Sequence, residues 1–199
     1  IAQSALTNLK KVTLELGGKS PMVVFADVDV DTAVDYALFA IYTNAGQVCS
    51  AGSRMLVDES IYPTFVKKMA ERAKKIAVGP GLDSETEMGP LVSEQQMKRV
   101  LEYIEIGKKE GAKLELGGKQ LTGSKYENGY YVEPTIFTDC KNDMRIVQEE
   151  IFGPVVVVQK FSSEEEAIEL ANSTAFGLAG AVFTSDVTRA HRVVKAIRA

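Results

Sequence analysis

The stretch Gly153-Pro154-Val155-Val156-Val157-Val158 points most directly to the fold. Four consecutive β-branched residues after a Gly-Pro turn predict a strand, and the lack of alternating polar residues predicts that both of its faces are buried. Strands of this kind occur in parallel sheets covered by helices on both sides. Downstream, Ser163 and Glu166 form a capping pair that predicts a helix, and a further strand is expected over 179–184.

The upstream residues repeat this alternation of strands and helices. Met22-Val23-Val24-Phe25 indicates a second buried strand, and apolar residues from Ala33 to Ile41 recur at helical spacing. Apolar and polar residues alternate over 12–16, which predicts a half-buried strand there. The pattern predicts an α/β fold, with a three-layer, open, mostly parallel sheet and helices on both faces, in one domain over 1–199. The same criteria predict strands over 54–57, 114–116 and 130–137, and helices over 63–76, 93–104 and from 186 onward.

Composition excludes several classes of function. The 199 residues suffice to bury about 70% of the unfolded chain's surface. A formal net charge of −4 gives no basic footprint for nucleic acid, and no apolar run reaches the roughly 20 residues of a membrane helix. The single histidine, His191, excludes sites that need two histidines and leaves no obvious base for a serine or cysteine triad, and no metal is expected. Two cysteines form no disulfide scaffold, which favours a reducing, cytoplasmic compartment.

Both ends of the chain are abrupt. The sequence starts at Ile1 rather than at methionine, so a targeting segment would not be visible. The last helical pattern reaches Ala199 without a Gly or Pro stop signal. We therefore expect the chain to be an excised piece of a longer protein.

Cys49 is the first candidate for chemistry. It follows the end of a predicted helix, in a loop of small residues that lets a substrate and backbone amides approach the sulfur. Free cysteines are more often buried as small hydrophobic residues, and this remains the alternative for Cys49. Cys140 lacks such a loop and is interpreted as structural.

Glu15 is the second candidate. It lies opposite Leu14 and Leu16 on the predicted strand and precedes a Gly17-Gly18 break, although an exposed strand glutamate is usually only solvated. The string Leu-Glu-Leu-Gly-Gly-Lys at 14–19 recurs at 114–119, and because the flanking residues differ, we interpret the repeat as coincidence. No phosphate-binding loop or G-x-G-x-x-G fingerprint is present.

The loop Glu149-Glu150-Ile151-Phe152-Gly153-Pro154 directly precedes the apolar strand and permits two interpretations. It is either a turn with two solvated acids, or a loop that offers a carboxylate to a ribose and an aromatic face to a flat ring.

Together, these motifs resemble the catalytic domain of the aldehyde dehydrogenase superfamily. Residues 14–21 are similar to the glutamate signature of that family, residues 42–49 to its cysteine signature, and residues 150–154 to a later landmark, all in the family's order. Residues 89–91 and 172–178 also resemble family landmarks, so the resemblance covers essentially the whole chain. The run 48–54 looks closest to bacterial betaine aldehyde dehydrogenases and near relatives.

The resemblance implies a role for each matching residue. Cys49 would be the nucleophile that forms a thiohemiacetal and then a thioester, with its own backbone N–H as one oxyanion donor. Glu15 would be the general base for thioester hydrolysis. Glu150 would hold the nicotinamide ribose, Phe152 would pack near the nicotinamide, and Gly17 would belong to the same cofactor site. The cofactor is NAD or NADP, and these residues leave that choice open.

The resemblance also implies what this chain lacks. The coenzyme-binding domain and an asparagine oxyanion donor would precede Ile1, and a C-terminal oligomerisation segment would follow Ala199. We therefore expect the chain alone to be inactive, and the full-length protein to form a homodimer or homotetramer that acts on a small aldehyde. The alternatives are an aminoaldehyde or broad-range enzyme, an acylating enzyme, which often lacks a base at the Glu15 position, or a non-catalytic relative of the fold.

Overall fold

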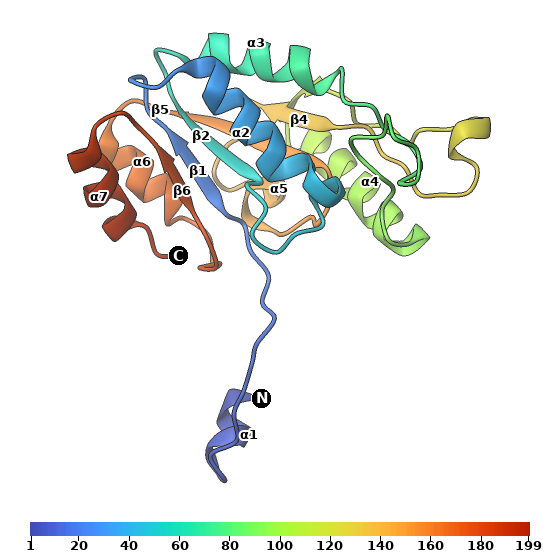
Figure 1. The fold of residues 1–199 in the computed structure, drawn as a ribbon. Coiled ribbons are helices and arrows are strands. Elements are labelled where there is room, and N and C mark those ends of the chain that lie inside the picture. Colours follow the sequence, from blue (N-terminus) through green and yellow to red (C-terminus); the bar gives the residue numbers. More distant parts are fainter.

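Six strands form one sheet in the computed structural model, which describes residues 1–199, and their order is β3-β4-β5-β2-β1-β6 (Figure 1). All neighbouring strands are parallel except β3, which runs antiparallel to β4 at one edge. The predicted α/β fold with a mostly parallel sheet is therefore confirmed. The strands are β1 (Pro21–Val24), β2 (Arg54–Asp58), β3 (Lys113–Leu116), β4 (Thr135–Thr138), β5 (Val155–Phe161) and β6 (Ala181–Phe183).

Helices cover both faces of the sheet because alternate strand residues point to opposite sides. Met22 and Val24 of β1 pack in a core that includes α2 and α3, whereas Val23 and Phe25 pack in a smaller core with α6 and α7. The helices are α1 (Ala2–Leu6), α2 (Val30–Tyr42), α3 (Tyr62–Ala73), α4 (Glu94–Lys109), α5 (Arg145–Gln148), α6 (Glu164–Ala171) and α7 (Val187–Ala196), with short 3₁₀ turns at Thr43–Gly46 and Ser124–Tyr126. None of these helices combines the length and the apolar character needed to cross a membrane.

Local sequence signals set the helix ends. The Ser93 hydroxyl accepts from the N–H of Gln96 at the start of α4, and Ser163 does the same for Glu166 at the start of α6. The C-terminal end of α2 lies at Tyr42 because the backbone of 44–46 turns left-handed. These ends agree with the sequence prediction.

Two predicted strands differ from the structure. Residues 12–16 form no strand, since the segment projects away from the sheet with α1 at its tip and meets no partner strand (Figure 1). Leu14 and Leu16 are 46% and 57% exposed, so alternation alone was insufficient to bury them. The strand predicted over 130–137 is shorter, because β4 begins at Thr135 and the residues before it form only isolated bridges.

The central strands β5, β2 and β1 are adjacent and parallel, so the segments that precede them lie together at the amino ends of these strands. Glu150 precedes β5, Cys49 precedes β2, and Gly17-Gly18 precedes β1. The topology therefore brings all the motifs of the sequence analysis near the amino ends of these three strands, except the arm with Glu15.

Candidate functional site

Three loops meet at the amino ends of β1, β2 and β5. The N–H of Gly18 donates to Oε1 of Glu150 at 2.9 Å, across 132 residues of sequence. A Cβ atom on Gly18 would lie 2.3 Å from the carbonyl oxygen of Cys49, and one on Gly17 would lie 2.5 Å from Oε2 of Glu150. Glycine is required where backbones approach this closely. Gly17 and Gly18 thus join the cysteine loop to the loop that carries Glu150.

The Cys49 loop is shaped by an unusual backbone. Asn44, Ala45 and Gly46 all have positive φ, and a Cβ on Gly46 would lie 2.0 Å from the carbonyl oxygen of Gly153. This turn redirects the chain after α2 and presses the Cys49 loop against the loop 149–153. Cys49 is partly exposed, as a nucleophile must be.

Cys140 is a very different thiol. It is buried, and its Sγ donates only to the carbonyl oxygen of Thr138 at 3.5 Å. Burial raises the pKa of the Cys140 thiol to about 12. Since thiolate is the nucleophilic form, Cys140 is unreactive near neutral pH, and Cys49 is the accessible thiol of this chain.

Glu15 lies apart from these loops. Its side chain is exposed on the projecting arm, and it forms no hydrogen bond or ion pair. The structure therefore does not join Glu15 to Cys49 or Glu150, although Glu15 precedes Gly17 by only two residues. Its role as a base stays a prediction.

The loop 149–153 is held from its side by α4. The Nε2 of Gln96 donates to the carbonyl oxygens of Ile151 at 3.0 Å and Phe152 at 2.7 Å. Nη2 of Arg99 donates to the carbonyl oxygen of Glu150 at 2.9 Å. Phe152 itself has a φ of 60°, an uncommon conformation for a bulky residue. Neither Gln96 nor Arg99 was predicted as a site residue from the sequence, although both lie within two helical turns of the cap Ser93.

The carboxylate of Glu149 anchors the same loop. It accepts from the hydroxyl of Tyr103 at 2.6 Å and from Nε of Arg145 at 2.8 Å. These hydrogen bonds, first that of Arg145 and then that of Tyr103, lower the pKa of Glu149 to about 2. Glu149 is therefore a fixed anion that ties the loop to α4 and α5, whereas the neighbouring Glu150 faces the glycines.

The residues present fit the nicotinamide end of a dinucleotide. The Glu150 carboxylate, held by the Gly18 N–H, retains acceptor capacity for ribose hydroxyls, and the Phe152 ring is 36% exposed beside it. An open hollow lies beside this loop, between Glu150, Phe152 and the first turns of α4. No group of three or more His, Cys, Asp or Glu side chains is arranged to hold a metal ion.

Two basic side chains are buried at the segment before β1, and neither was predicted from the sequence. Arg54 is fully buried and donates to the carbonyl oxygens of Lys19 at 3.0 Å, Leu170 at 2.9 Å and Ala171 at 2.8 Å. Lys19 is 2% exposed, and its Nζ has no hydrogen-bond partner. Burial, and then the charge of Arg54, lower the pKa of Lys19 to about 7. A charged residue at the head of the apolar run 54–57 was the available signal for Arg54.

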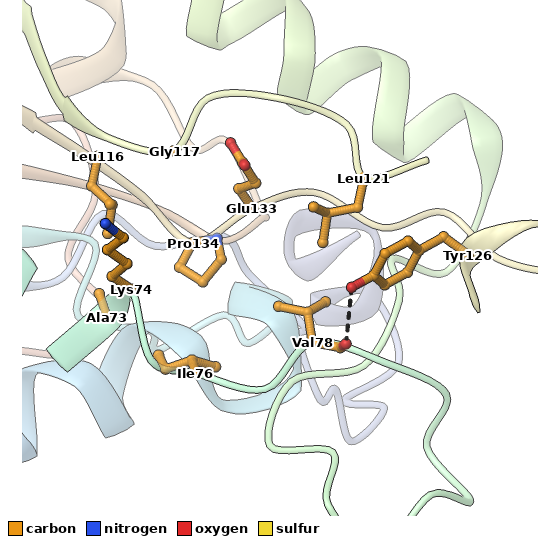
Figure 2. A pocket seen from close by; sticks show the side chains of 10 residues that line it. All are labelled: Ala73, Lys74, Ile76, Val78, Leu116, Gly117, Leu121, Tyr126, Glu133 and Pro134. Carbon is orange, nitrogen blue, oxygen red and sulfur yellow. Dashed lines mark hydrogen bonds between the residues drawn. The ribbon is translucent and has the colours of Figure 1, made fainter. Parts of the chain in front are cut away.

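A second hollow of about 270 Å³ lies beside β3 and β4, away from these loops. Figure 2 shows the Tyr126 hydroxyl, which donates to the carbonyl oxygen of Val78 at 3.4 Å and closes one side. It contains neither cysteine and none of the candidate residues, so it lies outside the candidate site. Its lining residues are Ala73, Lys74, Ile76, Val78, Leu116, Gly117, Leu121, Tyr126, Glu133 and Pro134.

Comparison with known proteins finds a family that covers the whole chain. Residues 1–199 match the aldehyde dehydrogenase family. The chain is 54% identical over 198 residues to betaine aldehyde dehydrogenase of Bacillus subtilis, and 54% identical over 199 residues to an aldehyde dehydrogenase of Enchytraeus buchholzi. These matches cover all of this chain but only 40% and 39% of the two relatives.

A solved structure shares the fold. Betaine aldehyde dehydrogenase of Staphylococcus aureus in complex with NAD+ superposes with a TM-score of 0.94 at 47% identity, over 99% of this chain and 39% of that one. Another structure of that enzyme, with a TM-score of 0.94 and 47% identity over 99% of this chain and 40% of that one, contains NAD+ and a BME-modified cysteine. The chain thus spans about two fifths of the length of the proteins it matches.

Proposed function

Because the chain belongs to the aldehyde dehydrogenase family, we propose that it is the catalytic domain of an NAD(P)-dependent aldehyde dehydrogenase, with Cys49 as nucleophile. The observation that carries this proposal is that Gly17-Gly18 contacts both the backbone of the partly exposed Cys49 and the Glu150 carboxylate. A non-catalytic relative would have no need to keep Cys49, Glu15 and Glu150 together in one chain.

Cys49 performs the covalent step. Its thiolate attacks the carbonyl carbon of the aldehyde, a C–S bond forms, and the carbonyl electron pair moves to oxygen to give a thiohemiacetal oxyanion. The backbone N–H of Cys49 is one donor to that oxygen. Bound NAD or NADP supplies the acceptor for the hydride that leaves the same carbon. Cys49 then carries a thioester, and water cleaves its C–S bond to release the carboxylic acid and return the thiol.

Glu15 is assigned to the hydrolytic step as general base for the attacking water. Glu15 lies two residues before Gly17, and the proposal requires the arm to turn at this glycine so that the carboxylate reaches the water at Cys49. A base at this position favours hydrolysis over acyl transfer to coenzyme A.

Glu150, Phe152 and Gly17 are assigned to the nicotinamide end of the cofactor. Glu150 binds the ribose hydroxyls, Phe152 packs near the ring, and the lack of a side chain at Gly17 leaves room for the Glu150 carboxylate. The NAD+ in the S. aureus relative supports NAD over NADP. No residue of this chain is assigned to the adenosine end or to the second oxyanion donor, so the chain alone is expected to be inactive.

Betaine aldehyde is the proposed substrate, since betaine aldehyde dehydrogenases are among the relatives at 47% and 54% identity. An aminoaldehyde or broad-range aldehyde is the alternative, and kcat/KM over a substrate panel in the full-length protein distinguishes them. Exposed Tyr36 and Phe39 on α2 favour a homodimer or homotetramer, and two unpaired thiols favour the cytoplasm.

Alkylation of the two thiols tests the nucleophile. With limiting iodoacetamide at pH 7.5, mass spectrometry is expected to find Cys49 modified at least ~100-fold faster than Cys140, because the Cys140 thiol is buried and protonated. In the full-length protein, Cys49→Ser is expected to abolish NAD-dependent oxidation of betaine aldehyde, whereas Cys140→Ser retains it. Equal, slow labelling of both thiols, or activity of Cys49→Ser, would contradict the proposal.

A further inference from the structure

The first turn of α4 contacts both active-site loops. Oε1 of Gln47, two residues before Cys49, accepts from the N–H of Val92 at 2.9 Å, directly before the helix cap. Nε2 of Gln96, one turn later, donates to the carbonyl oxygens of Ile151 and Phe152. One helix start therefore binds the thiol loop on one side and the loop of Glu150 on the other.

The start of α4 is a firm support. The Ser93 side chain caps the N–H of Gln96, and the helix face next to Gln96 is buried through Met97, Val100 and Ile104. A side chain that donates from such a helix is held by the core rather than by its own loop. The position of Gln96 is thus independent of the loop to which it binds.

The loop 149–153 needs such a support. A left-handed conformation at a residue with a Cβ costs roughly 1–2 kcal/mol, and Phe152 adopts it at φ 60°. The Gln96 amide binds the carbonyls on both sides of this strained backbone unit, and Arg99 binds the carbonyl of Glu150. Without the amide, the two carbonyls lose their donor and the loop can relax.

We propose that Gln96 is a positioning residue that holds Glu150 and Phe152 at a fixed distance from Cys49, with Gln47 tying the Cys49 loop to the same helix start. The inference rests on the proposed function of Cys49 and Glu150. Gln96 acts through backbone carbonyls and takes no proton from the substrate. Its loss therefore affects where the cofactor loop lies and leaves the thiol in place.

The test compares Gln96→Met with Gln95→Met in the full-length protein. Methionine matches glutamine in length but donates no hydrogen bond, and Gln95 is exposed on the same helix without a side-chain hydrogen bond. Gln96→Met is expected to raise KM for NAD about tenfold, while KM for the aldehyde and the alkylation rate of Cys49 stay within twofold. Gln96→Lys, which restores a donor, is expected to recover most of the loss, and Gln95→Met, which removes no contact to the loop, to leave the amide exchange of 149–153 unchanged.

Hydrogen–deuterium exchange separates this inference from the proposed function. Amides of 149–153 are expected to exchange at least tenfold faster in Gln96→Met than in Gln95→Met, whether or not the protein oxidises aldehydes. Unchanged exchange in a folded Gln96→Met protein overturns the positioning role. Faster exchange in a protein without NAD-dependent oxidation supports the positioning role and overturns the proposed function instead.

Discussion

The string Leu-Glu-Leu-Gly-Gly-Lys occurs twice in this chain and has two different structures. At 114–119, its first residues belong to β3, Gly117 and Gly118 turn left-handed, and Lys119 is exposed. At 14–19, the first residues form no strand, neither glycine is left-handed, and Lys19 is buried. Identical local propensities thus give opposite patterns of exposure.

The two copies share one interaction, with different partners. The N–H of the second glycine donates to a side-chain oxygen in each case, from Gly18 to Glu150 at 2.9 Å and from Gly118 to Thr135 at 3.0 Å. One acceptor is a carboxylate beside the Cys49 loop, and the other is a hydroxyl at the start of β4. The string offers a backbone donor, and the neighbouring loop decides whether that donor serves a candidate active site or a turn.

Alanine substitutions of the four glycines give the largest expected effect. The second glycine is the more sensitive one in the first copy of the string, and the first glycine is the more sensitive one in the second copy. Gly18→Ala places a Cβ 2.3 Å from the Cys49 carbonyl, and Gly117→Ala places one 2.1 Å from the Pro134 carbonyl at φ 74°. Each is expected to destabilise the protein by about 3 kcal/mol, because backbone cannot yield as a side chain can. Gly17→Ala and Gly118→Ala meet only side chains and are expected to cost about 1–2 kcal/mol. Urea denaturation measures all four.

Equal losses of unfolding free energy for the two glycines of each copy would contradict this prediction. A larger loss for Gly118→Ala than for Gly18→Ala would show that the left-handed turn, rather than the approach to the Cys49 loop, is the stronger constraint.

Substitution of the two glutamates of the string, Glu15 and Glu115, gives the next largest expected effect, on catalysis in the full-length protein. Glu15→Gln is expected to lower steady-state kcat about 100-fold by removing the general base, while the initial burst of NADH persists. Glu115→Gln loses only an exposed ion pair with Lys113 and is expected to keep kcat within twofold. A Glu15→Gln enzyme with more than half of the wild-type kcat would remove Glu15 from the mechanism.

The lysines give the last contrast, in the pH dependence of stability. The folded pKa of Lys19 is about 7 against 10.5 when unfolded, so between these values the unfolded chain binds one more proton. The free energy of unfolding therefore gains up to about 1.4 kcal/mol per pH unit from Lys19 between pH 7 and pH 10.5. Lys19→Met is expected to lose this slope, and Lys119→Met to keep it. Urea denaturation between pH 7.5 and 9.5 provides the measurement, and parallel slopes for wild type and Lys19→Met would contradict it.

The sequence predicted the elements whose signals are local. The apolar runs at 22–25 and 155–158 became β1 and β5, and Ser93 and Ser163 cap the helices expected after them. The motifs also predicted the family, which the comparison confirmed. The prediction failed for 12–16, because alternation specifies which side chains could be buried but supplies no partner strand.

Contacts between distant segments of the chain could not be predicted from local sequence patterns. Gln96 reaches Ile151 across 55 residues, and Arg54 reaches Lys19 across 35. Each contact depends on how α4 and β2 are placed in the fold. Before that placement is known, nothing in the sequence distinguishes Gln96 from a solvated glutamine.

By itself, the sequence determined the α/β class, the positions of the central strands and the set of residues that resemble an aldehyde dehydrogenase site. These follow from periodicity, caps and motif order, all of which act within a few residues of the chain. Only the tertiary structure decided that Gly17-Gly18 lies between Cys49 and Glu150, that Lys19 is buried while Lys119 is solvated, and that α4 supports both loops. The physical reason is that burial and close approach are properties of pairs of segments, and the sheet order sets those pairs.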